Sequence, residues 1–211
     1  MSELAVTNRT RLRRRAFRGS HERRVIDAIL DEALVCHVGF TTESGPAVIP
    51  TAFVRVDDHV YLHGSASNHM LRMAARGHDV CVAVTLLDGL VLARTAFHHS
   101  MNYRSVVMFG AGATITDPFE KRRVLAALVD RMVPSRSRAC RAPSDDELSG
   151  TLVIAVAIDE SSAKIRSGPP LADEGEDAAL PHWAGEVPIR LVRGVPISAP
   201  DCPLPAPGEL G

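Results

Sequence analysis

The feature that most constrains the fold of this chain is a series of short apolar runs separated by turn residues. The runs cover residues 34–40, 47–56, 60–63, 80–87, 90–96, 105–116, 152–158 and 163–166. Runs of this length, rich in Val, Ile and Leu and bounded by Gly, Pro and Asp, are typical of strands. Hairpin turns are expected at residues 43–46, at Asp57-Asp58 and at Asp88-Gly89. The pattern therefore predicts a mostly antiparallel sheet.

Fewer segments have the pattern of helices. Apolar residues recur at helical spacing over 25–33, and a second helix over 68–76 ends before Gly77. Asp117-Pro118 opens a third helix, and the capping box at residues 144–147 opens a short fourth one. Strands and helices do not alternate, which argues against a doubly wound sheet. We expect a mainly β (α+β) protein, with a barrel of six to eight antiparallel strands and three or four peripheral helices.

The composition of the 211 residues excludes several classes of protein. With 45% hydrophobic residues and a formal net charge of −1, the chain is expected to fold over most of its length. Its longest apolar stretch, 152–158, is too short for a membrane helix, which needs about 20 residues. The four cysteines form no C-x-x-C pair, which disfavours a disulfide scaffold or a zinc ribbon. We expect a cytoplasmic protein with no membrane partner.

The two ends of the chain differ from its centre. Residues 9–24 hold eight arginines and one acid, Glu22. Such an arm could bind nucleic acid or anionic lipid, but Phe17 is its only aromatic residue, so a solvated tail is favoured and a nucleic-acid partner is not expected. Residues 196–211 contain five prolines. The predicted division is a basic tail over 1–19, a folded domain over 20–195 and a proline-rich tail over 196–211.

Two features of the sequence suggest a dinucleotide site and a metal site, but neither meets the requirements of such a site. Gly110-Ala111-Gly112 resembles the start of a dinucleotide fingerprint, but it continues as a strand and opens no helix. Its small residues are better explained by close packing. The chain has nine histidines, and His59 and His63 share one face of a strand. Their spacing does not require a metal ion, and none is expected.

Two other segments could bind a phosphate group. Residues 63–67 join a strand to a helix, and the glycine, the hydroxyls of Ser65 and Ser67 and the free amides of a helix start suit an anion, with Arg72 nearby. Simple N-capping by Ser65 or Ser67 explains this segment equally well. In Tyr103-Arg104-Ser105 the guanidinium could grip a phosphate while the hydroxyls donate hydrogen bonds. Together the segments indicate a mononucleotide cofactor held on a barrel.

These segments resemble a known family. Ser100-Met101-Asn102-Tyr103-Arg104-Ser105-Val106, followed by Phe109-Gly110, is similar to the signature of the nitroimidazole-resistance-type branch of the pyridoxamine 5'-phosphate oxidase-like proteins. Residues 61–65, 162–166, the acidic stretch 173–177 and residues 181–185 match the rest of the pattern in order. The resemblance covers residues 20–195.

The resemblance implies an FMN-binding split β-barrel that acts as a homodimer, with two cofactor sites at the subunit interface. The residues that it implies for the flavin are Pro50, Thr51, His63, Gly64, Ser65, Ser67, Arg72, Tyr103, Arg104, Ser105, Lys164 and Trp183. Pro50 and Thr51 would face the ring, and Lys164 and Trp183 would lie near the partner's flavin. A solvated Lys164 and a Trp183 that only anchors the late segment are the structural alternatives.

The function implied is that of an FMN-dependent oxidoreductase acting on a small molecule such as a nitroaromatic compound. His63 is the expected catalytic residue, exchanging a proton beside the flavin. The alternative is a non-catalytic protein that holds flavin, haem or a deazaflavin in the same groove, with histidines as haem ligands. Many related barrels have a basic residue where Asn68-His69 stand here. We therefore expect weaker binding of the FMN phosphate or a different ligand.

Overall fold

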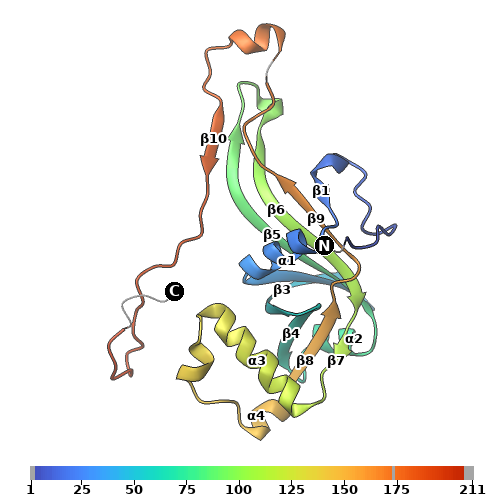
Figure 1. Cartoon of the computed structure of the whole chain (residues 1–211), viewed down its shortest axis with the longest axis vertical. Coiled ribbons are helices and arrows are strands. Elements are labelled where there is room, and N and C mark those ends of the chain that lie inside the picture. Colours follow the sequence, from blue (N-terminus) through green and yellow to red (C-terminus); the bar gives the residue numbers. More distant parts are fainter. Residues whose placement is uncertain (1–2, 173, 207–211) are drawn as a thin grey trace.

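A single large sheet organises the protein in the computed structural model, which describes residues 3–172 and 174–206 (Figure 1). Its strands are β1 (Gly19–Ser20), β2 (Val35–Thr42), β3 (Gly45–Val56), β4 (His59–Ser65), β5 (Asp79–Leu92), β6 (Ser100–Ala111), β7 (Ala113–Thr114), β8 (Thr151–Ala157), β9 (Ser161–Arg166) and β10 (Gly185–Pro188). The order is β1-β9-β6-β5-β2-β3-β4-β8-β7, all neighbours pair antiparallel, and β10 joins β5. The sheet is not closed, as in a split barrel. The described residues form ten strands, because β1, β7 and β10 are too short to show in the sequence pattern.

Four α-helices and four 3-10 turns accompany the sheet. They are α1 (Arg23–Glu32), α2 (His69–Ala75), α3 (Pro118–Met132), α4 (Asp145–Ser149), η1 (Ala16–Arg18), η2 (Ala96–His98), η3 (Arg136–Ala139) and η4 (Gly175–Ala179). Helix α3 begins as predicted, since the carboxylate of Asp117 accepts hydrogen bonds from the first turn. The predicted capping box opens α4. The α+β prediction is confirmed.

Two hydrophobic clusters lie on different parts of the sheet. In the larger cluster, Ile26 and Leu30 of α1 pack with Val84 of β5 and Val106 of β6. In the smaller cluster, Leu128 of α3 packs on the face of β3, β4 and β8. Helices α1 and α3 therefore cover separate areas.

The predicted hairpin turn at Asp88-Gly89 is wrong. Strand β5 runs through both residues, with a register shift against β6 between Leu87 and Gly89. Strand β10 pairs with the outer part of β5, so this part is hydrogen-bonded along both edges. These bonds keep the chain extended, and the shift is a β-bulge. The chain reverses after Leu92, in a segment that contains η2.

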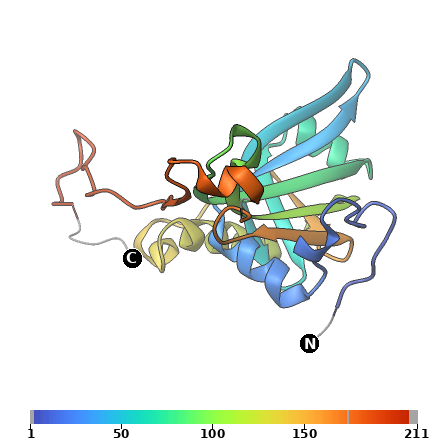
Figure 2. The ribbon, with the colours of Figure 1, turned by 90° about the horizontal axis from the view of Figure 1, so that it is seen from above.

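The ends of the chain lie outside the sheet (Figures 1 and 2). Near the N-terminus, Thr7 donates a hydrogen bond to Glu160, and Arg9 pairs with Glu160 and Asp79. Arg9 thus differs from the expected solvated arginine. After β10 the chain runs past α3 with exposed apolar residues, among them Leu191 and Ile197. Residues 207–211 of the predicted tail lie outside the described residues, and the domain boundaries stay a prediction.

Gly112 lies where the chain has no room for a side chain. A Cβ atom there would lie 2.5 Å from Cγ2 of Ile154 and 3.0 Å from the carbonyl oxygen of Ala74. We expect Gly112→Ala to lower the free energy of unfolding by about 1–3 kcal/mol through overpacking. Urea unfolding would measure this. Gly194→Ala is the control, because its Cβ would meet nothing within 4 Å. Equal urea midpoints of unfolding for Gly112→Ala and Gly194→Ala would contradict the prediction.

Candidate functional site

Tyr103, Arg104 and Ser105 follow one another on strand β6, so their side chains point in turn to opposite faces of the sheet. Val106 and Met108 point into the cluster beneath α1. Because side chains alternate along a strand, Arg104 shares their side, whereas Tyr103 and Ser105 point to the opposite face. The three residues therefore cannot approach one ligand from one side of the sheet.

Arg104 is bound by two carboxylates of its own chain. Its guanidinium forms fork-like pairs with Glu32 at the end of α1 and with Asp88 of β5, at 2.7 Å for Nη2 in each case. These bonds, with Glu32 the larger contributor, raise the pKa of Arg104, and the bond from Arg104 lowers the pKa of Glu32. A phosphate at Arg104 would have to displace both carboxylates. Its role as a phosphate ligand stays a prediction.

Tyr103 and Ser105 belong to a face of the sheet that we call the open face. In an antiparallel sheet, directly opposed residues point to the same side, so Pro50 of β3 shares a face with His37 of β2. His37 is opposed to Ala83 of β5, two residues before Thr85, and Thr85 is opposed to Ser105 of β6. The side chains of these residues are exposed or half-buried. So are the apolar neighbours on this face, Val35, Val48 and Leu87, with exposed fractions of 50%, 65% and 43%.

Lys164 connects the open face to the N-terminal segment. The Ser105 hydroxyl donates a hydrogen bond of 3.2 Å to the carbonyl oxygen of Lys164. The ammonium of Lys164 donates a hydrogen bond of 3.3 Å to the carbonyl oxygen of Arg14. Lys164 is therefore held by two bonds and is half-buried, unlike a freely solvated strand residue.

His63 lies away from the open face. It pairs with Val153 of β8, next to Tyr61 and the α3 cluster. It lines a cavity of about 480 Å³, the histidine cavity, whose other residues include Arg122, Leu125, Leu128, Val129 and Arg141. Nδ1 of His63 is buried without a hydrogen-bond partner among the described residues, and burial lowers the pKa of this imidazole. The ring is therefore neutral at neutral pH.

The segment that follows His63 is turned toward its own helix. Gly64 packs against Leu71, and a Cβ atom there would lie 3.0 Å from Cδ1 of that residue. The hydroxyls of Ser65 and Ser67 bond to one another at 2.9 Å. N-capping by either serine is wrong, because the side chain of Asn68 accepts the bond from the Leu71 amide. Arg72 is exposed on α2.

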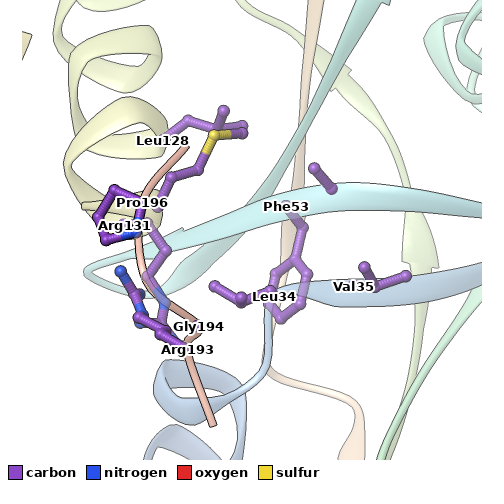
Figure 3. Close-up of a pocket in the computed structure, with 10 residues that line it drawn as sticks. Leu34, Val35, Phe53, Leu128, Arg131, Arg193, Gly194 and Pro196 are labelled. Atoms are coloured by element: carbon purple, nitrogen blue, oxygen red, sulfur yellow. The ribbon is translucent and has the colours of Figure 1, made fainter. Parts of the chain in front are cut away.

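An apolar cavity of about 510 Å³ lies beside the open face (Figure 3). Val35 comes from β2 and Phe53 from β3, Leu128 and Arg131 come from α3, and Gly194 lies in the C-terminal segment. The other lining residues are Leu34, Ala52, Met132, Arg193 and Pro196. Arg131 fixes the end of α3 by a bond to the carbonyl oxygen of Ala33. Leu128 lines both this cavity and the histidine cavity.

The remaining predicted residues are scattered. Thr51 is half-buried on β3, and its side chain lies on the same side as buried Cys36. Trp183 precedes β10 and is 65% exposed. Asp173, the first residue of the predicted acidic stretch, lies outside the described residues. One chain therefore brings together Pro50, Tyr103, Ser105 and Lys164, but neither His63 nor Trp183.

Sequence reasoning missed His37 and Thr85 on the open face. Thr85 is the polar member of an apolar strand, and the alternation around it was the signal that could have found it. Within residues 3–172 and 174–206, no three His, Cys, Asp or Glu side chains are arranged to hold a metal ion. No helix in the described part of the chain is long and apolar enough to cross a membrane.

Comparison with known proteins identifies relatives over most of the chain. The family model described as pyridoxamine 5'-phosphate oxidase matches residues 22–165. The chain is 37% identical to a protein described as the flavocytochrome Anf3 from Azotobacter vinelandii, with 94% of each chain covered and a TM-score of 0.86. It is 40% identical to a protein described as FAD- and haem-binding from Mycobacterium smegmatis, with 89% of this chain and 94% of that one covered and a TM-score of 0.84.

A more distant relative is assigned to 5-nitroimidazole antibiotic resistance in Bacteroides thetaiotaomicron. It is 26% identical, with 70% of this chain and 86% of that one covered and a TM-score of 0.59. A comparison with curated protein sequences gave no match.

Proposed function

Because the chain belongs to the pyridoxamine 5'-phosphate oxidase family, we propose that it is a redox protein that binds a flavin on its open face and haem in its histidine cavity. The observation that carries the proposal is that the sheet leaves two separate places for ligands. The open face presents hydroxyl groups, and the histidine cavity presents the imidazole of His63, whose Nδ1 has no hydrogen-bond partner among the described residues. Two relatives at 37% and 40% identity support this pairing, since one is described as a flavocytochrome and the other as binding FAD and haem.

The open face suits the flavin. The hydroxyls of Thr85, Tyr103 and Ser105 could bond to its ribityl chain and phosphate, and Pro50 would lie against the ring. Ring-shaped ligands need apolar walls with few polar contacts, and the neighbouring cavity of Figure 3 has mostly apolar walls. A bound flavin accepts and donates electrons, while the protein positions it and controls the access of water. FMN remains the expected form, with FAD as the alternative named for one relative.

A second copy of the chain is proposed to cover the open face. Val35, Val48 and Leu87 leave a large fraction of their apolar surface exposed there. Contiguous apolar surface of this kind marks interaction sites. The resulting homodimer would enclose two flavins, with Lys164 and Trp183 near the partner's flavin.

The histidine cavity suits haem. A neutral imidazole can serve as an axial ligand, and burial keeps the imidazole of His63 neutral. Nδ1 has no hydrogen-bond partner among the described residues, so the ring would lose no hydrogen bond of this atom when it turns a nitrogen toward the iron. Leu125, Leu128 and Val129 supply apolar contacts. Arg122 and Arg141 also line the cavity and could pair with the carboxylates of the propionates, which would have to displace Asp145 and Glu147 from them. Haem would add one-electron chemistry. With haem present, His63 would be a ligand, and its predicted role in proton transfer would apply only to a protein with flavin alone.

Absorption spectra would test the flavin half of this function. The purified protein, incubated with FMN or FAD and then desalted, is expected to retain a yellow chromophore. The triple variant Thr85→Val, Tyr103→Phe, Ser105→Ala should bind flavin at least about tenfold more weakly, because each hydrogen bond contributes about 0.5–1.5 kcal/mol. Ser44→Ala, in the exposed β2–β3 turn, is the control. A wild-type protein that stays colourless, or a triple variant with wild-type affinity, would overturn the assignment of the open face.

The substrate is the less constrained part of the proposal. Reduction of a nitroaromatic compound is proposed from the branch that the sequence resembles, and a deazaflavin stays an alternative to the flavin. Consumption of a nitroimidazole by the flavin-loaded protein with a reductant would support the first, whereas tighter binding of a deazaflavin than of FMN would support the second.

A further inference from the structure

A third cavity, of about 370 Å³, is lined by positively charged side chains. Arg14, Arg15 and Arg18 come from the N-terminal segment, and Arg166 comes from the end of β9. Phe97 of the β5–β6 connection and Ser100 at the start of β6 also line the cavity, with His98, His99 and Leu171. We call this the arginine cavity. Arg14, Arg15 and Arg18 belong to the run of residues 9–24, for which the sequence pattern favoured a solvated tail.

The protein holds this arginine segment in a defined conformation. Gly19 and Ser20 of β1 pair with Lys164 and Ala163 of β9. The ammonium of Lys164 donates to the carbonyl oxygen of Arg14. Arg15 has a left-handed backbone with φ of 54°, a conformation that is unfavourable for a non-glycine residue. A strained residue that tertiary contacts maintain marks a candidate functional position.

The positive charge in the arginine cavity has little compensation. Within residues 3–172 and 174–206, the side chains of Arg14, Arg15 and Arg18 form no ion pair with a carboxylate. A bound anion would supply the missing counter-charge and relieve the repulsion between these guanidinium groups.

Arg166 carries the deepest of these charges. It is 6% exposed, and in the described part of the chain its guanidinium donates to neutral oxygens, those of Asn102, Gly168 and Pro169. Its Nε–H has no partner among the described residues. Burial, and then the charges of Arg18 and Arg15, lower the pKa of Arg166, whereas Glu186 acts in the other direction. An unpaired buried charge is costly, and an anion in the cavity would remove that cost.

We propose that the arginine cavity binds the diphosphate group of a nucleotide, with the base stacked against Phe97. Several arginine forks in one cavity match a group that carries several phosphate oxygens better than they match a single carboxylate. Phe97 is 91% exposed, so its ring is available to a planar base. The diphosphate could belong to free ADP or to the ADP half of FAD. Only the second source rests on the proposed flavin site, because Lys164 connects the cavity to the open face.

Calorimetric titration of the purified protein with ADP would test the cavity itself. We expect saturable binding of ADP, with AMP weaker because it lacks the second phosphate. The double variant Arg15→Gln, Arg18→Gln should bind ADP at least about tenfold more weakly, since hydrogen bonds between charged groups contribute more than those between neutral groups. The matched control is Arg11→Gln, Arg13→Gln, which removes the same charge from exposed positions outside the cavity. Its affinity should change less than twofold.

Further arms separate the parts of the proposal. Phe97→Ala should weaken ADP severalfold and leave inorganic pyrophosphate unchanged. If FAD is the source, the double variant should lose affinity for FAD and keep its affinity for FMN, and ADP should compete with FAD. If free nucleotide is the source, ADP should bind equally to protein loaded with either flavin. Absence of saturable ADP binding, or an equal loss of ADP affinity in both arginine double variants, would overturn the proposal for the arginine cavity. The assignment of the flavin to the open face would be unaffected.

Discussion

The variant His63→Ala is expected to abolish haem binding while the protein still takes up flavin. The wild-type protein titrated with haem should develop a Soret band, and the variant should show at least about 100-fold weaker binding. This estimate follows because even groups that only orient a metal ligand contribute 10–100-fold to affinity, and His63 would be the ligand itself. The structural reason is that His63 lines a cavity that also contains Leu125, Leu128 and Val129, and that its buried Nδ1 has no hydrogen-bond partner among the described residues.

His59→Ala is the matched control for this experiment. His59 lies on the same strand and the same face four residues earlier, and its ring contacts Tyr61 at 6.0 Å between centroids, but it does not line the histidine cavity. Its Soret band should equal that of the wild type. Added imidazole should restore the band of His63→Ala by occupying the position of the lost ligand. An unchanged Soret band in His63→Ala would exclude this residue as the haem ligand, whereas a wild-type protein that develops no Soret band would favour the flavin-only function, in which His63 transfers protons.

Phe53→Ala should give the largest loss of stability. Phe53 is 2% exposed, pairs with Leu62 on β4 and belongs to the larger hydrophobic cluster. Truncation of a buried phenylalanine costs about 3–5 kcal/mol, from lost transfer free energy and the cavity left behind. For a domain of this size, that corresponds to a fall in Tm of roughly 6–20 °C. Since Phe53 also lines the apolar cavity of Figure 3, the new space would enlarge that cavity.

Differential scanning calorimetry would measure this change. Phe119→Ala is the control, because Phe119 on α3 is 77% exposed and its removal should shift Tm by no more than about 1–2 °C. A fall of less than 3 °C for Phe53→Ala would show that the surrounding residues collapse into the space. It would also show that the cavity of Figure 3 is adaptable.

Local chemistry explains why much of the fold could be predicted. A helix start depends on neighbours in the chain, so the Asp117-Pro118 pair and the capping box at Ser144 located α3 and α4 correctly. The strands with apolar alternation were found for the same reason. The turn at Asp88-Gly89 failed because its sequence suits a hairpin, whereas the pairing of β10 with β5, from about 100 residues later in the chain, keeps the backbone extended.

The candidate site was predictable only in part. The hydroxyls of Tyr103 and Ser105 were found because the motif around them is local, but Arg104 between them points to α1 and pairs with Glu32 and Asp88. Whether a strand residue faces a ligand or a helix depends on which side of the sheet that helix covers. The sequence pattern does not tell which side this is. His37 and Thr85 were missed for the same reason, as they join the open face only through the register of four strands, β3, β2, β5 and β6.

By itself, the sequence determined the α+β class, the starts of α3 and α4, most strands and the family, because each depends on patterns within a few residues or on a local motif. The tertiary structure decided which charges are free. Of the arginines that composition could not distinguish, Arg104 is neutralised by two carboxylates, whereas Arg14, Arg15 and Arg18 meet Arg166 around one cavity. Charges interact through space and not along the chain, so only the folded arrangement separates an arginine held by its own protein from one available to a ligand.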